Sequence, residues 1–244
     1  MDHAPWTRKM ARWALWCALV ALIVAGVGVT LARYDIIPKL IGLYAMIGGG
    51  LLAMLSVLFA VIALFLNMRW RAGAGLMAGF ALILGGGFSG FLLSRVAIAK
   101  SVPPIHDITT DLHNPPQFTH LRVRADNLIG VGTIERWRAL HGAAYALRPV
   151  VVPKPVAAVI ADVDRLARAR GWDVAFVDPA EGRLEATATV SFIRFEDQVV
   201  VLVTAMPDGS GSVVNMRSVS RVGIGDQGVN ARRINEFMSA LAGA

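Results

Sequence analysis

The sequence predicts an α+β protein in which three transmembrane helices precede an antiparallel-sheet domain bracketed by helices. The 244-residue chain is 55% hydrophobic and only 17% charged, which is too apolar for an ordinary soluble domain. Its apolar pattern also changes, because long uncharged runs in the first hundred residues give way to shorter, alternating runs. We therefore divide the chain into a three-helix transmembrane anchor (1–98), a Pro-rich extended arm (99–122) and an α+β extracytoplasmic domain (123–244).

Three stretches of the anchor are long enough to cross a bilayer: residues 13–31, 41–66 and 74–94 contain no Asp, Glu, Lys, Arg or His. A helix needs roughly twenty apolar residues to span the hydrocarbon. The first stretch exceeds a signal-peptide core of about 7 to 15 residues, so we interpret it as a retained signal anchor. Because no span has a charged side chain, we do not expect a transporter.

The net charge of +7 belongs entirely to this apolar part of the chain. Residues 1–100 contain nine Lys and Arg against two Asp, whereas the remaining residues contain 15 basic and 15 acidic side chains. Basic residues that flank membrane spans explain this excess, so we expect the bilayer and no nucleic acid as a partner. Five basic residues on one side of the spans against four on the other favour a cytoplasmic N-terminus. The predicted location is the bacterial inner membrane, with a periplasmic C-terminal domain.

Glycines at four-residue spacing recur in the spans, as Gly75 and Gly79 and as Gly86 and Gly90. Small residues at this spacing let helices approach closely. We expect a tightly packed anchor, and a homo-oligomer formed through the same glycines stays open.

Two Pro-Pro pairs in the arm forbid a continuous helix and favour an extended chain. Three histidines follow one another at intervals of seven residues: His106, His113 and His120. One interpretation is a metal site formed with nearby aspartates, and the other is a rigid arm packed against the domain. Because structural metal ligands are usually spaced more tightly, we favour the arm and expect no metal and no other cofactor.

Beyond the arm, the hydrophobic periods predict an antiparallel meander between two helices. The first helix opens at Pro155 and ends before Gly171, and the last begins at about Gly228. The strands are predicted at residues 172–177, 183–191, 199–206 and 212–221, of which the continuously apolar third is typical of a central strand.

Several separated motifs occur in order along this part of the chain. They are VPPIHDITTD and the NPP that follows, GW at Gly171, GRLEAT from Gly182, and RSVSRVG with DxGVNAxRI from Arg217. Residues 101–241 thereby resemble the uncharacterised bacterial family called domain of unknown function fourteen-ninety-nine, some members of which have a three-span anchor. The resemblance implies a fold and a topology but no activity. The family usually has acidic residues where this chain has Gln198 and Asn215, and an arginine at Leu202.

The stretch RVGIGDQGVNARRI, residues 221–234, contains the Gly-x-Gly-x-x-Gly spacing of dinucleotide-binding loops. That site also needs a second parallel strand and an acidic residue about twenty positions further on. Because only 16 residues follow Gly228, we expect no dinucleotide site.

We predict instead that an anion binds near this turn. Arginines on one face of the preceding strand would point toward the N–H groups that begin the last helix. The predicted ligand-binding residues are Arg217, Arg221, Asp226, Asn230, Arg233 and Glu185. The structural alternative is an ion pair of Arg217 with Glu185, while Arg221 and Asp226 fix the turn.

Ser218 and Ser220 lie near Asp226 in the sequence and could form a catalytic triad with a histidine. Nothing in the sequence brings a histidine to them, and no Gly-x-Ser-x-Gly elbow is present, so we predict no catalytic residue. The favoured function is a membrane-anchored binding or scaffold module of the bacterial envelope that recognises an anionic small molecule or an envelope protein. The alternative is a hydrolase-like envelope enzyme acting on a lipid or cell-wall substrate.

Overall fold

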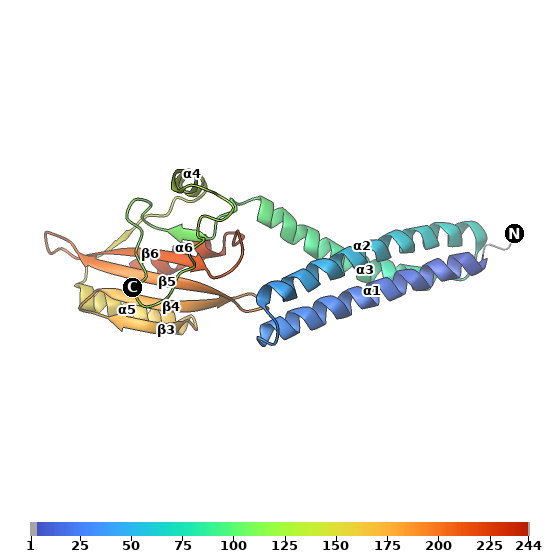
Figure 1. Ribbon diagram of the computed structural model, residues 1–244, viewed down its shortest axis with the longest axis horizontal. Helices are drawn as coiled ribbons and strands as arrows, with labels where there is room; N and C mark the ends of the chain where they lie inside the picture. Colours follow the sequence, from blue (N-terminus) through green and yellow to red (C-terminus); the bar gives the residue numbers. More distant parts are fainter. Residues whose placement is uncertain (1–3, 244) are drawn as a thin grey trace. The chain divides into compact units, whose positions relative to one another are not determined.

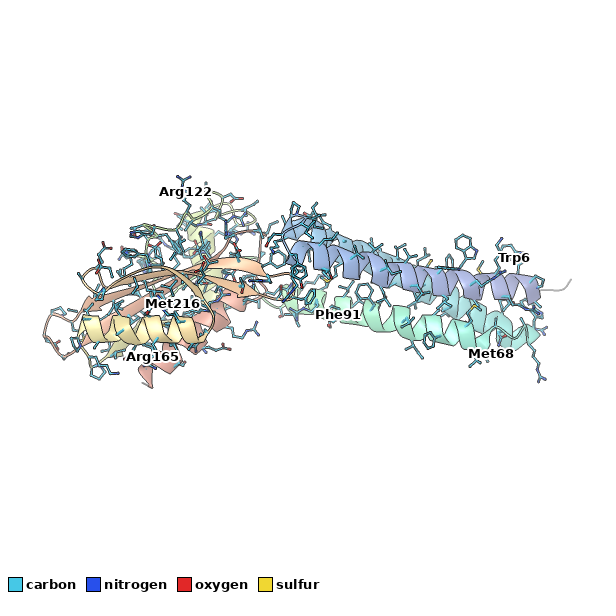
Figure 2. All side chains as sticks on the ribbon, turned by 90° about the horizontal axis from the view of Figure 1, so that it is seen from below. Trp6, Met68, Phe91, Arg122, Arg165 and Met216 are labelled. Carbon is cyan, nitrogen blue, oxygen red and sulfur yellow. The ribbon has the colours of Figure 1, made fainter. Side chains whose placement is uncertain are left out.

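Residues 4–243 are described by a computed structural model, in which they form two units that divide between residues 98 and 99 (Figure 1). The first unit consists of three helices, of which the third extends two residues into the second unit: α1 (Ala4–Arg33), α2 (Lys39–Trp70) and α3 (Gly75–Lys100). All three are long and apolar enough to cross a membrane, which confirms the three predicted stretches. Bulky side chains such as Trp6 and Met68 project outward from these helices (Figure 2), as expected of a surface that faces lipid.

Small residues let α1 and α2 pack closely together. A Cβ atom on Gly42 would come within 2.4 Å of the Cβ of Ala32, and one on Gly49 within 2.6 Å of the carbonyl oxygen of Ala21. Neither position has room for a larger side chain, so these glycines set the distance between the helices.

The glycines of α3 have two different environments. A Cβ atom on Gly85 would come within 2.9 Å of Ser56 Oγ in α2, so Gly85 is an internal contact. By contrast, a Cβ on Gly79, Gly86 or Gly90 would meet no other heavy atom within 4 Å. Within residues 4–243, these three glycines do not pack the unit together, and the homo-oligomer predicted from them stays a prediction.

The second unit is built on a six-stranded antiparallel sheet in the order β1-β6-β5-β4-β3, with β2 also paired to β6. The α+β prediction is therefore confirmed. Its elements in chain order are β1 (Asp107–Thr109), α4 (Ile134–Ala144), β2 (Val150–Val152), α5 (Val156–Ala169), β3 (Asp173–Asp178), β4 (Arg183–Val190), β5 (Phe195–Ala205), β6 (Ser212–Ser220) and α6 (Val229–Ala242).

The two faces of this sheet have different neighbours. Helices α5 and α6 cover one face (Figure 1), where Met216 of β6 belongs to the hydrophobic core with Ile234 and Phe237 of α6. Side chains alternate along β6, so its intervening residues point to the opposite face, which the segment after β1 covers. There Asn215 accepts a hydrogen bond from Thr110 at 3.0 Å. We call these the helix face and the arm face.

The segment predicted as a separate arm belongs to the second unit, because β1 lies within it and pairs with β6. The indole of Trp137 in α4 donates a hydrogen bond to the carbonyl of Asp107 at 2.9 Å, which ties α4 to this strand. No helix or strand was predicted at β1, β2 or α4. Both strands have three residues, too few for an alternating pattern to be recognised.

Candidate functional site

The six predicted site residues lie on both faces of the sheet and do not form one cluster. Asn230 and Arg233 of α6 are buried against the helix face. Glu185 and Arg217 point to the arm face, where Glu185 is held by the segment after β1 and Arg217 by Asp107 of β1 itself. The last helix was predicted beside the arginine-bearing face of β6, but its apolar stripe packs it onto the other face.

The helix-face residues form a closed network of hydrogen bonds. Arg233 donates to Asp197 of β5 at 2.6 Å and to Ser218 at 2.8 Å. The Asn230 amide oxygen accepts from Ser218 at 2.7 Å and from Arg233, and its nitrogen donates to Ser220 Oγ at 2.9 Å. Each of these groups is buried, and their partners come from the protein itself, so the network fastens α6 to the sheet.

Arg217 pairs with Asp107, not with Glu185 as the structural alternative had it. Its guanidinium donates to both carboxylate oxygens of Asp107, at 2.8 and 2.6 Å, and to the carbonyl of Pro116 at 3.2 Å. Glu185 of β4 is aligned with Val200 of β5, and Val200 is aligned on its other side with Arg217 of β6. Strand β5 therefore lies between Glu185 and Arg217. Two strand spacings of about 4.8 Å separate their backbones, and the Arg217 guanidinium is already bound by Asp107 and Pro116.

Glu185 is a fully buried carboxylate that binds the chain after β1. It accepts hydrogen bonds from the backbone N–H groups of Thr119, His120 and Leu121, at 2.7, 3.0 and 2.7 Å. Burial raises the pKa of Glu185, but the hydrogen bonds from these N–H groups outweigh burial, and its pKa is lowered. The carboxylate therefore stays ionised and acts as an internal anchor for residues 119–121.

The N–H groups at the start of α6 are occupied by Asp226. Its carboxylate accepts from the N–H of Gly228 at 2.9 Å and of Asn230 at 2.6 Å, and burial raises the pKa of Asp226. Arg221 does not take part in this turn, since it forms an exposed ion pair with Glu196. An external anion would have to displace a carboxylate of the protein to reach these N–H groups.

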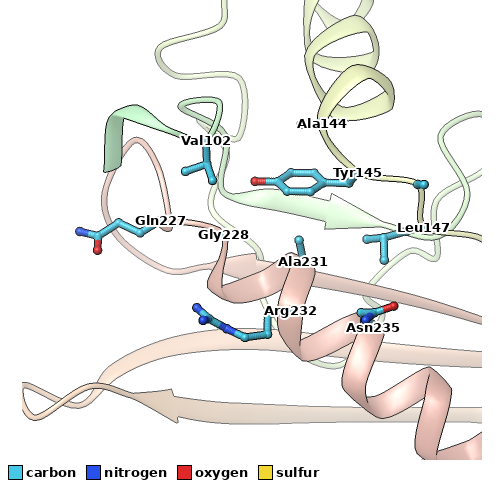
Figure 3. A pocket seen from close by; sticks show the side chains of 10 residues that line it. Val102, Ala144, Tyr145, Leu147, Gln227, Gly228, Ala231, Arg232 and Asn235 are labelled. Atoms are coloured by element: carbon cyan, nitrogen blue, oxygen red, sulfur yellow. The ribbon is translucent and has the colours of Figure 1, made fainter. Parts of the chain in front are cut away.

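An open groove of about 490 Å³ lies beside the first turn of α6 (Figure 3). Its walls come from the start of the second unit, from the segment after α4 and from α6. The lining residues are Val102, Ala144, Tyr145, Ala146, Leu147, Gln227, Gly228, Ala231, Arg232 and Asn235.

The groove contains two groups suited to an anion. The Tyr145 hydroxyl is inaccessible to solvent and has no hydrogen-bond partner among residues 4–243. Burial and the nearby charge of Asp226 raise the pKa of Tyr145 to about 12, so the hydroxyl remains a donor at neutral pH. Arg232 is exposed on α6 and forms no ion pair within the described part of the chain. Neither group was predicted from the sequence: the predicted arginine of this helix was Arg233, and Tyr145 lies in a segment for which no helix or strand was predicted.

The serines proposed for catalysis have other partners. Both hydroxyls are hydrogen-bonded to Asn230, and Arg233 also donates to Ser218. The ring of His106 is hydrogen-bonded through Nδ1 to the carbonyl of Ile224 at 3.0 Å, and only its backbone carbonyl faces Asn230. This geometry gives the hydrolase alternative no support.

The histidines of the arm do not come together. His106 is buried, whereas His120 is half exposed and stacks on Phe176 with ring centres 3.5 Å apart. Among residues 4–243, no group of three or more His, Cys, Asp or Glu side chains is placed to hold a metal ion.

These features define a class of protein with three membrane-competent helices followed by an antiparallel α+β domain. The chain belongs to the family described as protein of unknown function DUF1499, which matches residues 107–241. The match begins at β1 and ends within α6, so the family corresponds to the sheet domain, and the resemblance seen in the motifs is confirmed. No curated protein and no solved structure matched the chain.

Proposed function

We propose that this protein is a membrane-anchored binding module of the bacterial envelope, whose sheet domain holds an anionic ligand in the groove beside α6. The observation that carries the proposal is the Tyr145 hydroxyl, which is buried at the groove and has no partner among residues 4–243. A buried donor without a partner costs about 1 to 3 kcal/mol, and a ligand oxygen that displaces the atoms covering the hydroxyl would remove that cost. A binding role accounts for this arrangement without any catalytic group.

The chemistry of the groove favours a phosphate or carboxylate group. Arg232 supplies a positive charge and five N–H donors, and Asn235 adds an amide on the same helix. The apolar side chains of Val102, Leu147 and Ala231 line the rest of the groove and would contact the uncharged part of the ligand. A small molecule with an anionic head and an apolar portion fits this lining.

The proposed location follows from the anchor and its charges. The positive-inside bias predicts a cytoplasmic N-terminus, and three spans would then place the groove outside the cytoplasm. A ligand of this module would accordingly be a component of the envelope.

Binding can be tested on the full chain in detergent micelles. Isothermal titration with inorganic phosphate and with glycerol phosphate, a soluble lipid headgroup, should show saturable binding. Arg232→Ala removes one charge-assisted contact and should weaken binding by about 1.5 to 3 kcal/mol, or roughly tenfold to a hundredfold.

Arg221→Ala is the matched control, because Arg221 is exposed and lies outside the groove. It should leave the affinity unchanged. If Arg221→Ala weakens binding while Arg232→Ala does not, the ligand binds at the strand end first predicted from the sequence, and the groove is excluded.

A further inference from the structure

The turn between β4 and β5 is unusual in its composition. Residues 191–194 form a turn closed by a hydrogen bond from the N–H of Arg194 to the carbonyl of Ser191, at 3.2 Å. Its two central residues are Phe192 and Ile193, whereas turn centres are normally Gly, Pro, Asn or Asp. Ile193 is buried, but Phe192 is 58% exposed. The turn therefore presents a large aromatic side chain to its surroundings.

The backbone of this turn is strained. Ser191 and Arg194 have φ angles of 64° and 61°, in the left-handed region that non-glycine residues rarely adopt. Strain of this kind costs about 1 to 3 kcal/mol and is concentrated at functional sites. An exposed aromatic on a strained turn points to an interaction surface.

Two further exposed apolar residues lie at the same end of the sheet. Arg221 follows the end of β6 and donates its N–H to Glu196, so the loop after β6 begins beside the turn of β4 and β5. Ile224 in that loop is 50% exposed, and it contacts Gly130, whose neighbour Ile129 is 41% exposed. The sheet thus ends in an apolar tip consisting of Phe192, Ile224 and Ile129.

Arginines surround the apolar tip. Arg194 is exposed in the turn itself. Arg221 is 53% exposed and pairs with Glu196. Arg124 donates to the carbonyl of Gly223 at 2.6 Å and pairs with Asp126. These three arginines and the two carboxylates that pair with them have a net charge of +1. A positive charge at the tip attracts an anionic surface.

The chain itself limits how far this tip can lie from the membrane. Pro104 packs against Gly225, 3.3 Å from the position of its missing Cβ, so the chain enters the second unit beside the loop of Ile224. The third apolar span ends at Ser94, and residues 95–100 continue as helix. The chain from Ser94 to Pro104 therefore consists of six helical residues and at most four extended ones. Its ends can lie no more than roughly 25 Å apart.

We propose that the apolar tip docks on the surface of the bilayer, with Phe192 and Ile224 inserted at the level of the lipid headgroups and Arg194 contacting anionic lipid. An aromatic side chain suits this depth, because its ring is apolar and tolerates the polar interface. The second unit is then held at the membrane by two attachments, its covalent anchor and the tip. This surface is independent of the groove and of any ligand bound there.

The experiment uses the full chain in vesicles of phosphatidylglycerol and brominated phosphatidylcholine. Cys17 is replaced by serine, and an environment-sensitive fluorophore is attached to Phe192→Cys or Ile224→Cys. The control is Val151→Cys, since Val151 is 56% exposed but belongs to β2, which pairs with the opposite end of β6. Bromine should quench the label at the tip at least about twice as strongly as at the control, because quenching requires contact with lipid.

Equal quenching at the tip and at Val151 would overturn the proposal. A tip label that is shielded from water but not quenched by bromine would also overturn it, because that pattern indicates contact with protein and not with lipid. Phe192→Asp should lower the quenching of the label at Ile224, and an unchanged value would also overturn it. Replacing phosphatidylglycerol by uncharged lipid should reduce quenching at both tip positions, and no reduction would exclude the role of Arg194.

Discussion

Arg233 of α6 and Asp197 of β5 form an ion pair in the interior of the sheet domain, with 2.6 Å between Nη2 and Oδ2. Both side chains are more than nine-tenths buried. The pair joins the last helix to a central strand, and Asn230 and the two serines of β6 complete its hydrogen bonds. Such a network stabilises one arrangement of helix and sheet only while all its members are present.

Removing one member of this pair should destabilise the domain strongly. Asp197→Ala leaves the charge of Arg233 buried without a partner, which costs about 3 to 5 kcal/mol. The double variant Asp197→Leu with Arg233→Met should be markedly more stable than Asp197→Ala, because it leaves no buried charge. Urea denaturation of the sheet domain measures the free energy of unfolding of both variants. Arg221→Ala, at an exposed pair, should change the free energy of unfolding by less than about 1 kcal/mol.

Hydrophobic periodicity was sufficient to predict most of the fold. Continuous apolar runs identified α1, α2, α3 and the central strand β5, and shorter, alternating runs identified β3, β4 and β6. The strand predicted at residues 212–221 corresponds to β6, which ends at Ser220 and so excludes Arg221. The three-residue strands β1 and β2 were missed, since their position depends on pairing with β6 and not on a local pattern.

The partners of the predicted site residues could not be derived from the sequence. Arg217 pairs with Asp107, 110 residues away, because β1 joins the sheet beside β6. The position of Glu185 relative to Arg217 depends on which strand separates them, and a sequence does not specify strand order. The groove was missed for the same reason, since Tyr145 and Arg232 come together only when α6 packs on the sheet.

Glu185 should make the stability of the sheet domain depend on acidic pH. Its folded-state pKa lies below its ordinary value of 4.5, so its stabilising effect is complete above pH 4.5 and is lost as the pH falls through the folded-state pKa. Glu185→Gln should lower stability at neutral pH by about 2 kcal/mol, because charge-assisted hydrogen bonds are lost. Thermal melts between neutral and acidic pH should show a smaller loss in the variant than in the wild type below pH 4.5. Parallel loss in both proteins would contradict this role.

Tyr145→Phe should change stability and ligand affinity in opposite directions. Removal of a buried hydroxyl that has no partner among residues 4–243 should stabilise the free protein by up to about 1 kcal/mol. The same substitution should weaken binding of phosphate or glycerol phosphate, because the ligand loses a donor. Calorimetry gives the affinity for the ligand and thermal melts give the stability of the free protein, both from one preparation. A less stable variant with unchanged affinity would assign the hydroxyl a structural role.

The outward glycines of α3 should control association within the membrane. Gly86 and Gly90 have open space where a side chain would be, so Gly86→Leu and Gly90→Leu should leave the helical unit folded. If these glycines form an interface between two copies, the leucines should lower the fraction of cross-linked dimer in bilayers. Gly85→Leu is the contrasting variant, since it should disrupt the contact with Ser56 of α2. An unchanged dimer fraction in both outward variants would exclude this interface.

The orientation of the chain should depend on a small difference in charge. The guanidinium of Arg8 donates to the carbonyl of Ala72 at 3.0 Å, so the N-terminal basic residues and those between α2 and α3 lie at one end of the helical unit. That end has five basic residues near the spans against four at the other, which predicts a cytoplasmic N-terminus.

Alkaline phosphatase fused after residue 244 should be active, whereas a fusion after Arg71 should be inactive. Replacing Arg8 and Lys9 by glutamine leaves three basic residues against four, and it should lower the activity of the first fusion and raise that of the second. The opposite activities in the unmodified chain would place the groove and the apolar tip in the cytoplasm.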